Sequence, residues 1–243
     1  MSGATTRHRA VTLGVLVAVL VGTAASTSGA PAAHPDPVVR HLGLDVDLDL
    51  AASANPSAAQ PVVADDAFAS DGVLRRAVKS DVTATGSAIC DTCDATSTAL
   101  QVLYVSRAKE ARLDNTAAAW AQGCKECTAT ALSVQVVVLR GAPAIVPNNR
   151  AIAVNAACVS CLVNSVAYQL VVSSRYDDRL SRESLAALRG WVAKQAEALR
   201  TLDQTKAERR AQRAADSALV DLEDLVTGDL GATTVSSDVE LGH

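Results

Sequence analysis

The chain has 243 residues, with 22 lysine and arginine residues against 26 aspartate and glutamate residues and a formal net charge of −4. This charge balance argues against a nucleic-acid-binding protein, which would carry a basic stripe. Only 2% of the residues are aromatic although 49% are hydrophobic. We therefore expect a core of small side chains at close separations, and no aromatic platform for a carbohydrate.

The N-terminus has the layout of a secretory signal peptide. Basic residues at 7–9 precede an apolar run over residues 10–21, and small residues follow. The run is shorter than the ~20 apolar residues that span a bilayer, so an uncleaved membrane anchor is the lesser alternative. We predict a signal peptide over residues 1–32, cleaved after Ala25 or Ala32, and a secreted, extracytoplasmic chain with no membrane segment after cleavage.

Two further segments have compositions typical of disorder. Residues 33–80 are rich in alanine, proline, serine and aspartate, which predicts a disordered linker. Within it, HLGLDVDLDL at 41–50 alternates with period two and is compatible with a short edge strand, which would be unstable if isolated. Residues 231–243 are predicted to be a disordered tail.

Three CxxC pairs recur at one fixed interval. Their first cysteines stand at 90, 124 and 158, which defines a constant 34-residue period, and a glutamine stands at the eighth position after the second cysteine of every pair. Such regularity predicts a stacked or bundled repeat domain, which we place over residues 81–175. The candidate site residues are the six cysteines of a disulfide framework and a polar core of three glutamines: Cys90, Cys93, Cys124, Cys127, Cys158, Cys161, Gln101, Gln135 and Gln169.

We interpret every unit as one helix. The expected fold is mainly α, an antiparallel helical repeat or bundle of three 34-residue CxxC units over about 81–106, 114–140 and 148–173. Turn signals such as Pro143 and Asn148–Asn149 separate the units. The β-branched ends of the units, for example VQVVVL, leave mixed α+β repeats as the alternative.

Residues 176–230 predict a long amphipathic helix that ends the array as a degenerate unit. Leu185, Leu188 and Val192 begin an apolar stripe, with Ser181 as the N-cap and Gly228 as the stop. The distal part of this helix is available for a protein partner, for example in a coiled coil. No nucleic-acid partner is expected.

The helical interpretation determines how the cysteines are expected to pair. Cβ atoms at i and i+3 of a helix lie ~5–6 Å apart, beyond the ~3.5–4.5 Å of a disulfide. Bonds between neighbouring units are then favoured over bonds within a CxxC pair. Each would close a loop of roughly thirty residues and contribute about 3–4 kcal/mol.

Metal binding and redox exchange are the competing explanations of the CxxC pairs. Zinc sites usually bring a second ligand pair ~15–20 residues after the first, and export disfavours reduced thiols. A redox dithiol needs an exposed first cysteine of low pKa, typically at a helix N-terminus. We therefore expect no metal and no cofactor, and keep an extracytoplasmic thiol-based metal-binding or redox protein as the alternative.

No motif for other chemistry is present. After signal removal the histidines are His34, His41 and His243, and the sequence contains no HExxH, no GxSxG and no glycine-rich phosphate loop. The sequence therefore predicts no catalytic activity and no catalytic residues.

The repeat pattern resembles a known group of sequences. CxxC, seven residues, glutamine and two aliphatic residues, then a Pro/Asn turn and AIAVNAAC at 151–158, is similar to repeats in uncharacterised exported proteins of actinobacteria. Similar repeats accompany some proteins labelled peptide zinc metalloproteases. The resemblance covers about residues 85–175, and the missing HExxH means that it implies no protease residue here. Together these features predict an exported, disulfide-stapled structural or interaction protein of the cell envelope.

Overall fold

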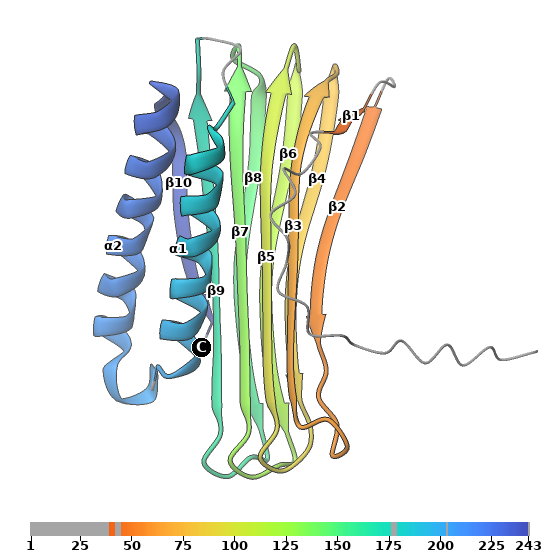
Figure 1. The fold of residues 1–243 in the computed structure, drawn as a ribbon, viewed down its shortest axis with the longest axis vertical. Helices are drawn as coiled ribbons and strands as arrows, with labels where there is room; N and C mark the ends of the chain where they lie inside the picture. Colours follow the sequence, from red (N-terminus) through yellow and green to blue (C-terminus); the bar gives the residue numbers. More distant parts are fainter. Residues whose placement is uncertain (1–38, 42–44, 176–178, 203, 243) are drawn as a thin grey trace, which may run out of the picture. The chain divides into compact units, whose positions relative to one another are not determined.

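The computed structural model describes residues 39–41, 45–175, 179–202 and 204–242. Within these ranges the backbone forms strands β1 to β10 and helices α1 and α2 (Figure 1). The predicted signal peptide lies outside the described residues. The strands assemble into two sheets, which we name sheet A and sheet B.

The two sheets differ in size, and successive strands of the repeat region alternate between them. Sheet A has the order β1-β3-β5-β7-β9-β10 and sheet B has the order β2-β4-β6-β8. The strands of sheet A are β1 (Val39–His41), β3 (Val62–Leu74), β5 (Asp94–Ser106), β7 (Thr128–Arg140), β9 (Leu162–Ser173) and β10 (Thr233–Gly242). The strands of sheet B are β2 (Asp45–Ala54), β4 (Ala77–Ala88), β6 (Glu110–Gln122) and β8 (Ala144–Ala156).

Apart from β10, strands of one sheet pair in parallel with the strands one coil before and one coil after them. In sheet A, Asp94 of β5 pairs with Thr128 of β7, and Thr128 pairs with Leu162 of β9. Parallel pairs require a crossover connection, and the intervening strand of sheet B supplies it. The chain is therefore a parallel β-solenoid of about four turns.

The predicted helical bundle is wrong, because the three CxxC units over 81–175 are pairs of strands. The central strands of sheet A are buried on both faces, one against sheet B and the other against helices. A strand covered on both faces has a continuous apolar run without the alternation that identifies a strand exposed on one side. Alanine, which favours helices, fills many of the inward positions, so the sequence resembles that of a buried helix.

The predicted linker over 33–80 and the predicted tail over 231–243 are also wrong where the structure describes them. Residues 45–80 form β2, β3 and the start of β4, and DVDLDL is the beginning of β2. These first coils lack CxxC pairs and are shorter, since the step from Val62 to its partner Asp94 spans less chain than the step from Asp94 to Thr128. The tail forms β10, which pairs antiparallel with β9.

The interior of the solenoid has an alanine half and a leucine/valine half. The alanine half lies near the cysteine turns and brings the two sheets close together. A Cβ atom added to Gly86 of β4 would lie 2.6 Å from the carbonyl oxygen of Thr130 in β7. The other half contains larger side chains such as Leu103, Leu113 and Leu139. The expected core of small side chains at close separations is thus confirmed for the alanine half.

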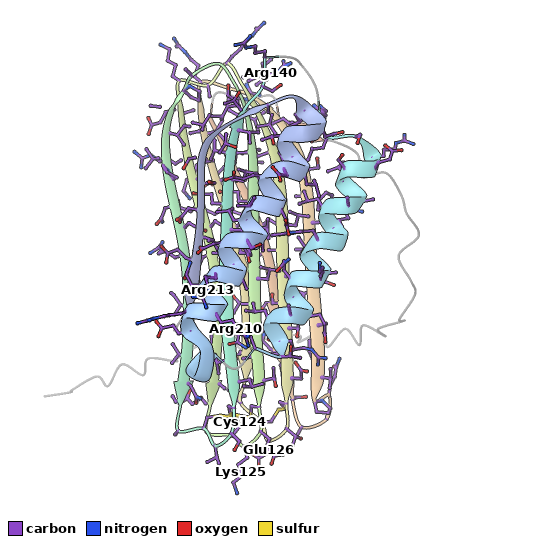
Figure 2. All side chains as sticks on the ribbon, turned by 90° about the vertical axis from the view of Figure 1, so that its left-hand side faces the viewer. Cys124, Lys125, Glu126, Arg140, Arg210 and Arg213 are labelled. Carbon is purple, nitrogen blue, oxygen red and sulfur yellow. A yellow bond between two sulfur atoms is a disulfide. The ribbon has the colours of Figure 1, made fainter. Side chains whose placement is uncertain are left out.

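Helices α1 (Arg182–Arg200) and α2 (Gln204–Leu230) cover the outer face of sheet A (Figure 2). Leu188 of α1 and Leu222 of α2 are fully buried against it. The hydroxyl of Ser181 accepts a hydrogen bond from the backbone N–H of Ser184, which confirms Ser181 as the N-cap of α1. The chain passes through Gly228 in helical form and leaves the helix at Gly231, which has φ +55°.

Strand β10 covers the C-terminal edge of sheet A. It runs antiparallel to β9 over most of its length, with Asp238 opposite Gln169, and so protects an edge that would otherwise be open to another chain. The outer face of sheet B has no comparable cover among the described residues. Neither helix in the described part of the chain combines the length and the apolar character needed to cross a membrane.

Candidate functional site

The three CxxC pairs lie in turns at one end of the solenoid. Each turn carries the chain from sheet B to sheet A, between β4 and β5, β6 and β7, or β8 and β9. Figure 2 shows Cys124, Lys125 and Glu126 at this end and Arg140 at the opposite end. The 34-residue interval therefore places equivalent cysteines in consecutive, stacked turns.

The turns share one backbone conformation and bond to one another. The third residue of each CxxC has a positive φ, 58° at Thr92, 53° at Glu126 and 57° at Ser160. The N–H of Thr92 donates to the carbonyl of Lys125 over 2.8 Å, and the N–H of Glu126 donates to the carbonyl of Val159 over 2.9 Å. These bonds continue the pairing of the sheets through the turns and fix the cysteines one above another.

Each disulfide joins the two cysteines of one CxxC pair. The pairs are Cys90–Cys93, Cys124–Cys127 and Cys158–Cys161, with Cα–Cα distances of 5.4, 6.3 and 6.0 Å. The predicted bonds between neighbouring units are therefore wrong. That prediction depended on a regular helix through each pair, whereas a tight turn folds the chain back and brings the two Cβ atoms within disulfide range.

Two of the three pairs also approach each other. The Sγ of Cys124 lies 3.4 Å from the Sγ of Cys158 and 3.9 Å from the Sγ of Cys161. With Cys127 these sulfurs form a group in which all four atoms lie within 4.8 Å of one another, and the pair of Cys90 and Cys93 is not part of it. Cys124 and Cys127 are buried and the pair of the last coil is half-buried, so one side of the group is open to solvent.

The three glutamines lie far from the cysteine turns, inside the solenoid at mid-strand. Gln101, Gln135 and Gln169 are 1%, 0% and 3% exposed. Gln169 donates from Nε2 to Oε1 of Gln135 over 2.8 Å, and Gln135 donates in the same way to Gln101 over 3.2 Å. Ser80 of β4 donates its hydroxyl to Oε1 of Gln101 over 2.5 Å. The glutamines thus form a ladder that satisfies buried amides from coil to coil.

A second amide ladder was not recognised in the sequence. Asn115 of β6 donates from Nδ2 to Oδ1 of Asn149 in β8 over 2.8 Å and accepts a 2.5 Å hydrogen bond from the hydroxyl of Ser133. Both asparagines lie in mid-strand, including Asn149, which we expected in a turn between two units. Their recurrence at the same interval as the cysteines, with an acidic or amide residue before each, was the available signal.

The outer face of sheet B carries a row of acidic and amide side chains. Asp49, Asp81, Asp114 and Asn148 pair across β2, β4, β6 and β8 in register. Asn148 donates a hydrogen bond to Asp114. Lys79, beside this row, contacts Asp81 over 2.6 Å, and its hydrogen bond with Asp81 is the main cause of its raised pKa. The same face also carries longer side chains, among them Arg112 and Trp120 of β6 and the exposed Ile152 and Val154 of β8.

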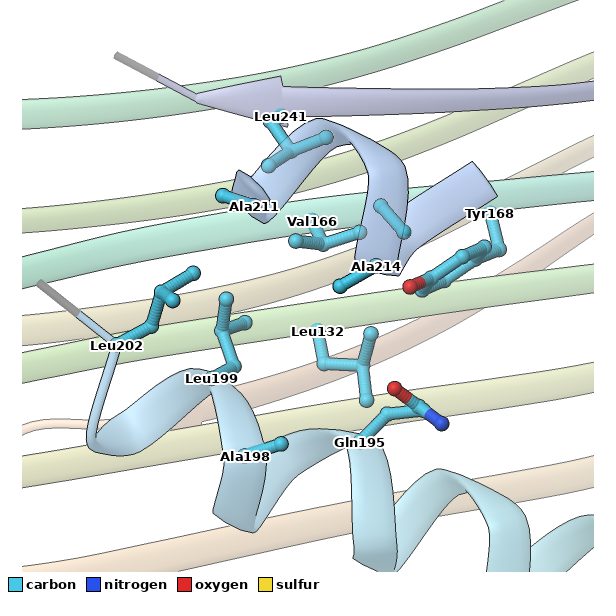
Figure 3. Close-up of a pocket in the computed structure, with 11 residues that line it drawn as sticks. Leu132, Val166, Tyr168, Gln195, Ala198, Leu199, Leu202, Ala211, Ala214 and Leu241 are labelled. Atoms are coloured by element: carbon cyan, nitrogen blue, oxygen red, sulfur yellow. The ribbon is translucent and has the colours of Figure 1, made fainter. Parts of the chain in front are cut away.

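A small apolar cavity lies between the helices and sheet A (Figure 3). Leu132, Val166 and Tyr168 line it from the sheet, and Leu199 and Gln195 line it from α1. Burial raises the pKa of Tyr168 well above the ordinary value for tyrosine, and its ring packs edge-on against Trp191 with centroids 5.1 Å apart. The cavity is part of the packing between the helices and the sheet.

These observations define a parallel β-solenoid with CxxC disulfides in stacked turns, one sheet covered by helices and one open face. The chain matches no family model, no curated protein and no solved structure.

Proposed function

We propose that this protein is an exported, disulfide-stapled structural scaffold of the cell envelope, which holds a partner on the outer face of sheet B. The observation that carries the proposal is the stack of three CxxC disulfides in consecutive turns. Disulfides persist in oxidising compartments outside the cytosol. The signal-like N-terminus, residues 1–32, supports the same location.

The solenoid suits a structural role because its buried glutamine and asparagine side chains are hydrogen-bonded from coil to coil. Amide ladders and aligned apolar side chains connect every coil to its neighbours, and β10 closes one edge of sheet A. A repeat protein of this kind presents a long regular surface.

The interaction surface proposed here differs from the C-terminal helix suggested by the sequence. The apolar stripe of α1 and α2 is buried against sheet A, with Leu188, Val192, Leu222 and Val226 in one cluster. Among the side chains that the structure describes, the outer face of sheet B instead presents five carboxylates against three cations. The carboxylates are Asp47, Asp49, Asp81, Glu110 and Asp114, and the cations are Lys79, Arg112 and Arg150. A partner with a basic surface complements this face.

The location and the disulfides are tested on the protein secreted by its own host. Intact mass before and after reduction should differ by six hydrogen atoms, two for each of the three disulfides, and the N-terminus should lie beyond the signal segment. Retention of the protein in the cytosol with free thiols would overturn the proposal.

The interaction surface is tested by retention on washed cell envelopes. A triple variant Asp49→Asn, Asp81→Asn, Asp114→Asn should be released at clearly lower salt than the wild type, because the basic partner loses its counter-charges. The matched control Glu208→Gln, Asp221→Asn, Asp224→Asn changes the net charge by the same amount, but on helix α2. Equal retention of the sheet B variant and the wild type would contradict this surface.

A further inference from the structure

We propose that four of the six cysteines form a zinc site once their disulfides are reduced: Cys124, Cys127, Cys158 and Cys161. The site would take one thiophilic divalent ion, for which Zn²⁺ is the representative. The pair Cys90–Cys93 takes no part. This inference is independent of the scaffold role, because it concerns the reduced chain.

The distances between the sulfur atoms carry the proposal. Zinc in a tetrahedral thiolate site has Zn–S bonds of about 2.3 Å, so the sulfurs of such a site lie about 3.8 Å apart. The distances from Cys124 to Cys158 and Cys161 are 3.4 and 3.9 Å, and all four sulfurs lie within 4.8 Å of one another. Cα–Cα distances of 6.3 and 6.0 Å within the two pairs leave room for the sulfurs of each pair to separate after reduction.

Stacking of the coils brings together two CxxC pairs that lie farther apart in the sequence than the ligand pairs of an ordinary zinc site. One full 34-residue coil separates the two CxxC pairs, about twice the usual separation of ligand pairs in zinc sites. Stacking of coils brings them together regardless of that separation, since the turns after β6 and β8 are hydrogen-bonded neighbours.

The surroundings of the sulfurs suit a buried thiolate site with an entry path. The backbone N–H of Cys127 points to the Sγ of Cys161 over 3.4 Å, and such outer hydrogen bonds stabilise ligand charge. Cys124 and Cys127 are shielded inside the stack, and Cys158 and Cys161 are half-buried in the last cysteine turn. An ion can therefore approach from the side of the last coil.

The chemistry balances with a dithiol or phosphine reductant. A dithiol gives two electrons and two protons to each protein disulfide and itself becomes a disulfide. A phosphine gives two electrons and takes the oxygen of one water molecule to become the phosphine oxide, and the two protons of that water complete the two thiols. Binding of Zn²⁺ to four thiols then releases four protons, so affinity should rise with pH. The metal-bound and disulfide forms use the same sulfurs and exclude each other.

The test uses the full chain, either oxidised or reduced with a phosphine and kept anaerobic. We expect one Zn²⁺ or Co²⁺ per reduced chain, with the intense thiolate-to-cobalt absorption of a tetrathiolate site, and none in the oxidised chain. Cys158→Ser/Cys161→Ser should lose more than about 100-fold in affinity, because even outer-shell changes cost about 10–100-fold. The matched control Cys90→Ser/Cys93→Ser should bind like the wild type.

Several results would overturn the proposal. They are full affinity in Cys158→Ser/Cys161→Ser, loss of binding in Cys90→Ser/Cys93→Ser, half an ion per chain, or no binding by the reduced wild type with its far-ultraviolet circular dichroism unchanged. If the double variant does not fold, Cys161→Ser alone is used. It should keep three sulfur ligands and show a weaker, shifted cobalt band.

Discussion

Gln169 donates a hydrogen bond from Nε2 to Oε1 of Gln135 over 2.8 Å, and the two side chains lie one coil apart inside the solenoid. The same contact joins Gln135 to Gln101 over 3.2 Å. Gln169 also donates to the carbonyl of Leu113 in the facing sheet over 3.0 Å. The ladder therefore connects neighbouring coils and both sheets at the middle of the interior.

The first prediction concerns the middle residue of this ladder. Gln135→Leu should lower the free energy of unfolding by about 1–3 kcal/mol, because it removes one hydrogen bond from Gln101 and one from Gln169 inside the solenoid. The triple variant Gln101→Leu, Gln135→Leu, Gln169→Leu should cost less than the sum of its three single changes. Urea unfolding monitored by circular dichroism measures both. If the triple variant lost as much unfolding free energy as the three single variants together, the glutamines would not be energetically coupled as the ladder requires.

The close approach of the two sheets gives a second prediction. Gly86→Ala should destabilise the protein by about 1–3 kcal/mol, because the added Cβ would lie 2.6 Å from a backbone oxygen that cannot rotate away. The matched control is Gly190→Ala in α1, where the added Cβ meets no atom within 4 Å apart from the local backbone of its own helix. This control should stabilise by up to about 1 kcal/mol. The same effect from both substitutions would argue against the tight packing at Gly86.

The disulfide pairing gives a third prediction. A bond within a CxxC turn closes a short loop, so removal of one pair, as in Cys90→Ser/Cys93→Ser, should lower the free energy of unfolding by about 2 kcal/mol in the loop-entropy model. Bonds between coils would contribute about 3–4 kcal/mol each. Peptide mapping of the unreduced protein should find each cysteine linked to its own CxxC partner. Cross-links between residues of different turns would contradict the structure.

Asn164 of β9 gives a fourth prediction, because its side chain caps the end of helix α1. Its Nδ2 donates to the carbonyl of Leu199 in the last turn of α1 over 2.7 Å and to the carbonyl of Leu202 just beyond the helix over 2.8 Å. Asn164→Ala should destabilise by about 1–3 kcal/mol. Thr201→Ala, which removes an exposed hydroxyl at the same helix end, serves as the control and should change stability by less than about 0.5 kcal/mol.

The fifth prediction is a loss of stability at alkaline pH. Burial is the main cause that raises the pKa of both Tyr104 and Tyr168 above the model-peptide value of 10.0. The folded state then keeps its phenol protons while the unfolded chain ionises near pH 10. The contribution to stability is complete below pH 10 and is lost as the pH rises towards the folded-state pKa.

Chemical unfolding at about pH 8 and about pH 11 measures this loss. Each buried tyrosine should lower the free energy of unfolding by up to about 1.4 kcal/mol for each pH unit above 10. Tyr168→Phe removes one ionisable group and preserves the ring against Trp191, so its stability should fall less steeply than that of the wild type. If the free energy of unfolding fell equally steeply with pH in Tyr168→Phe and in the wild type, the burial of the Tyr168 phenol would be contradicted.

Sequence reasoning found the repeat but assigned it the wrong secondary structure. The alignment of Cys124 with Cys158 and of Gln135 with Gln169 reflects real stacking, since these residues are neighbours in consecutive coils. Helix and strand could not be distinguished because β5 and β7 are buried on both faces. The first coils went unrecognised because they differ in length. The step from Asp45 to its partner Ala77 is shorter than the step from Glu110 to Ala144.

The sequence by itself determined a 34-residue period, the equivalence of three cysteine pairs and three glutamines, a core of small side chains and the N-cap Ser181. These properties depend on residue identity and on spacing along the chain, which the sequence contains directly. Only the tertiary structure decided that the units are strands, that each CxxC closes on itself and that two of the three pairs share one sulfur cluster. These properties depend on which coils become neighbours in space, and that follows from the burial of both sheet faces rather than from any local pattern.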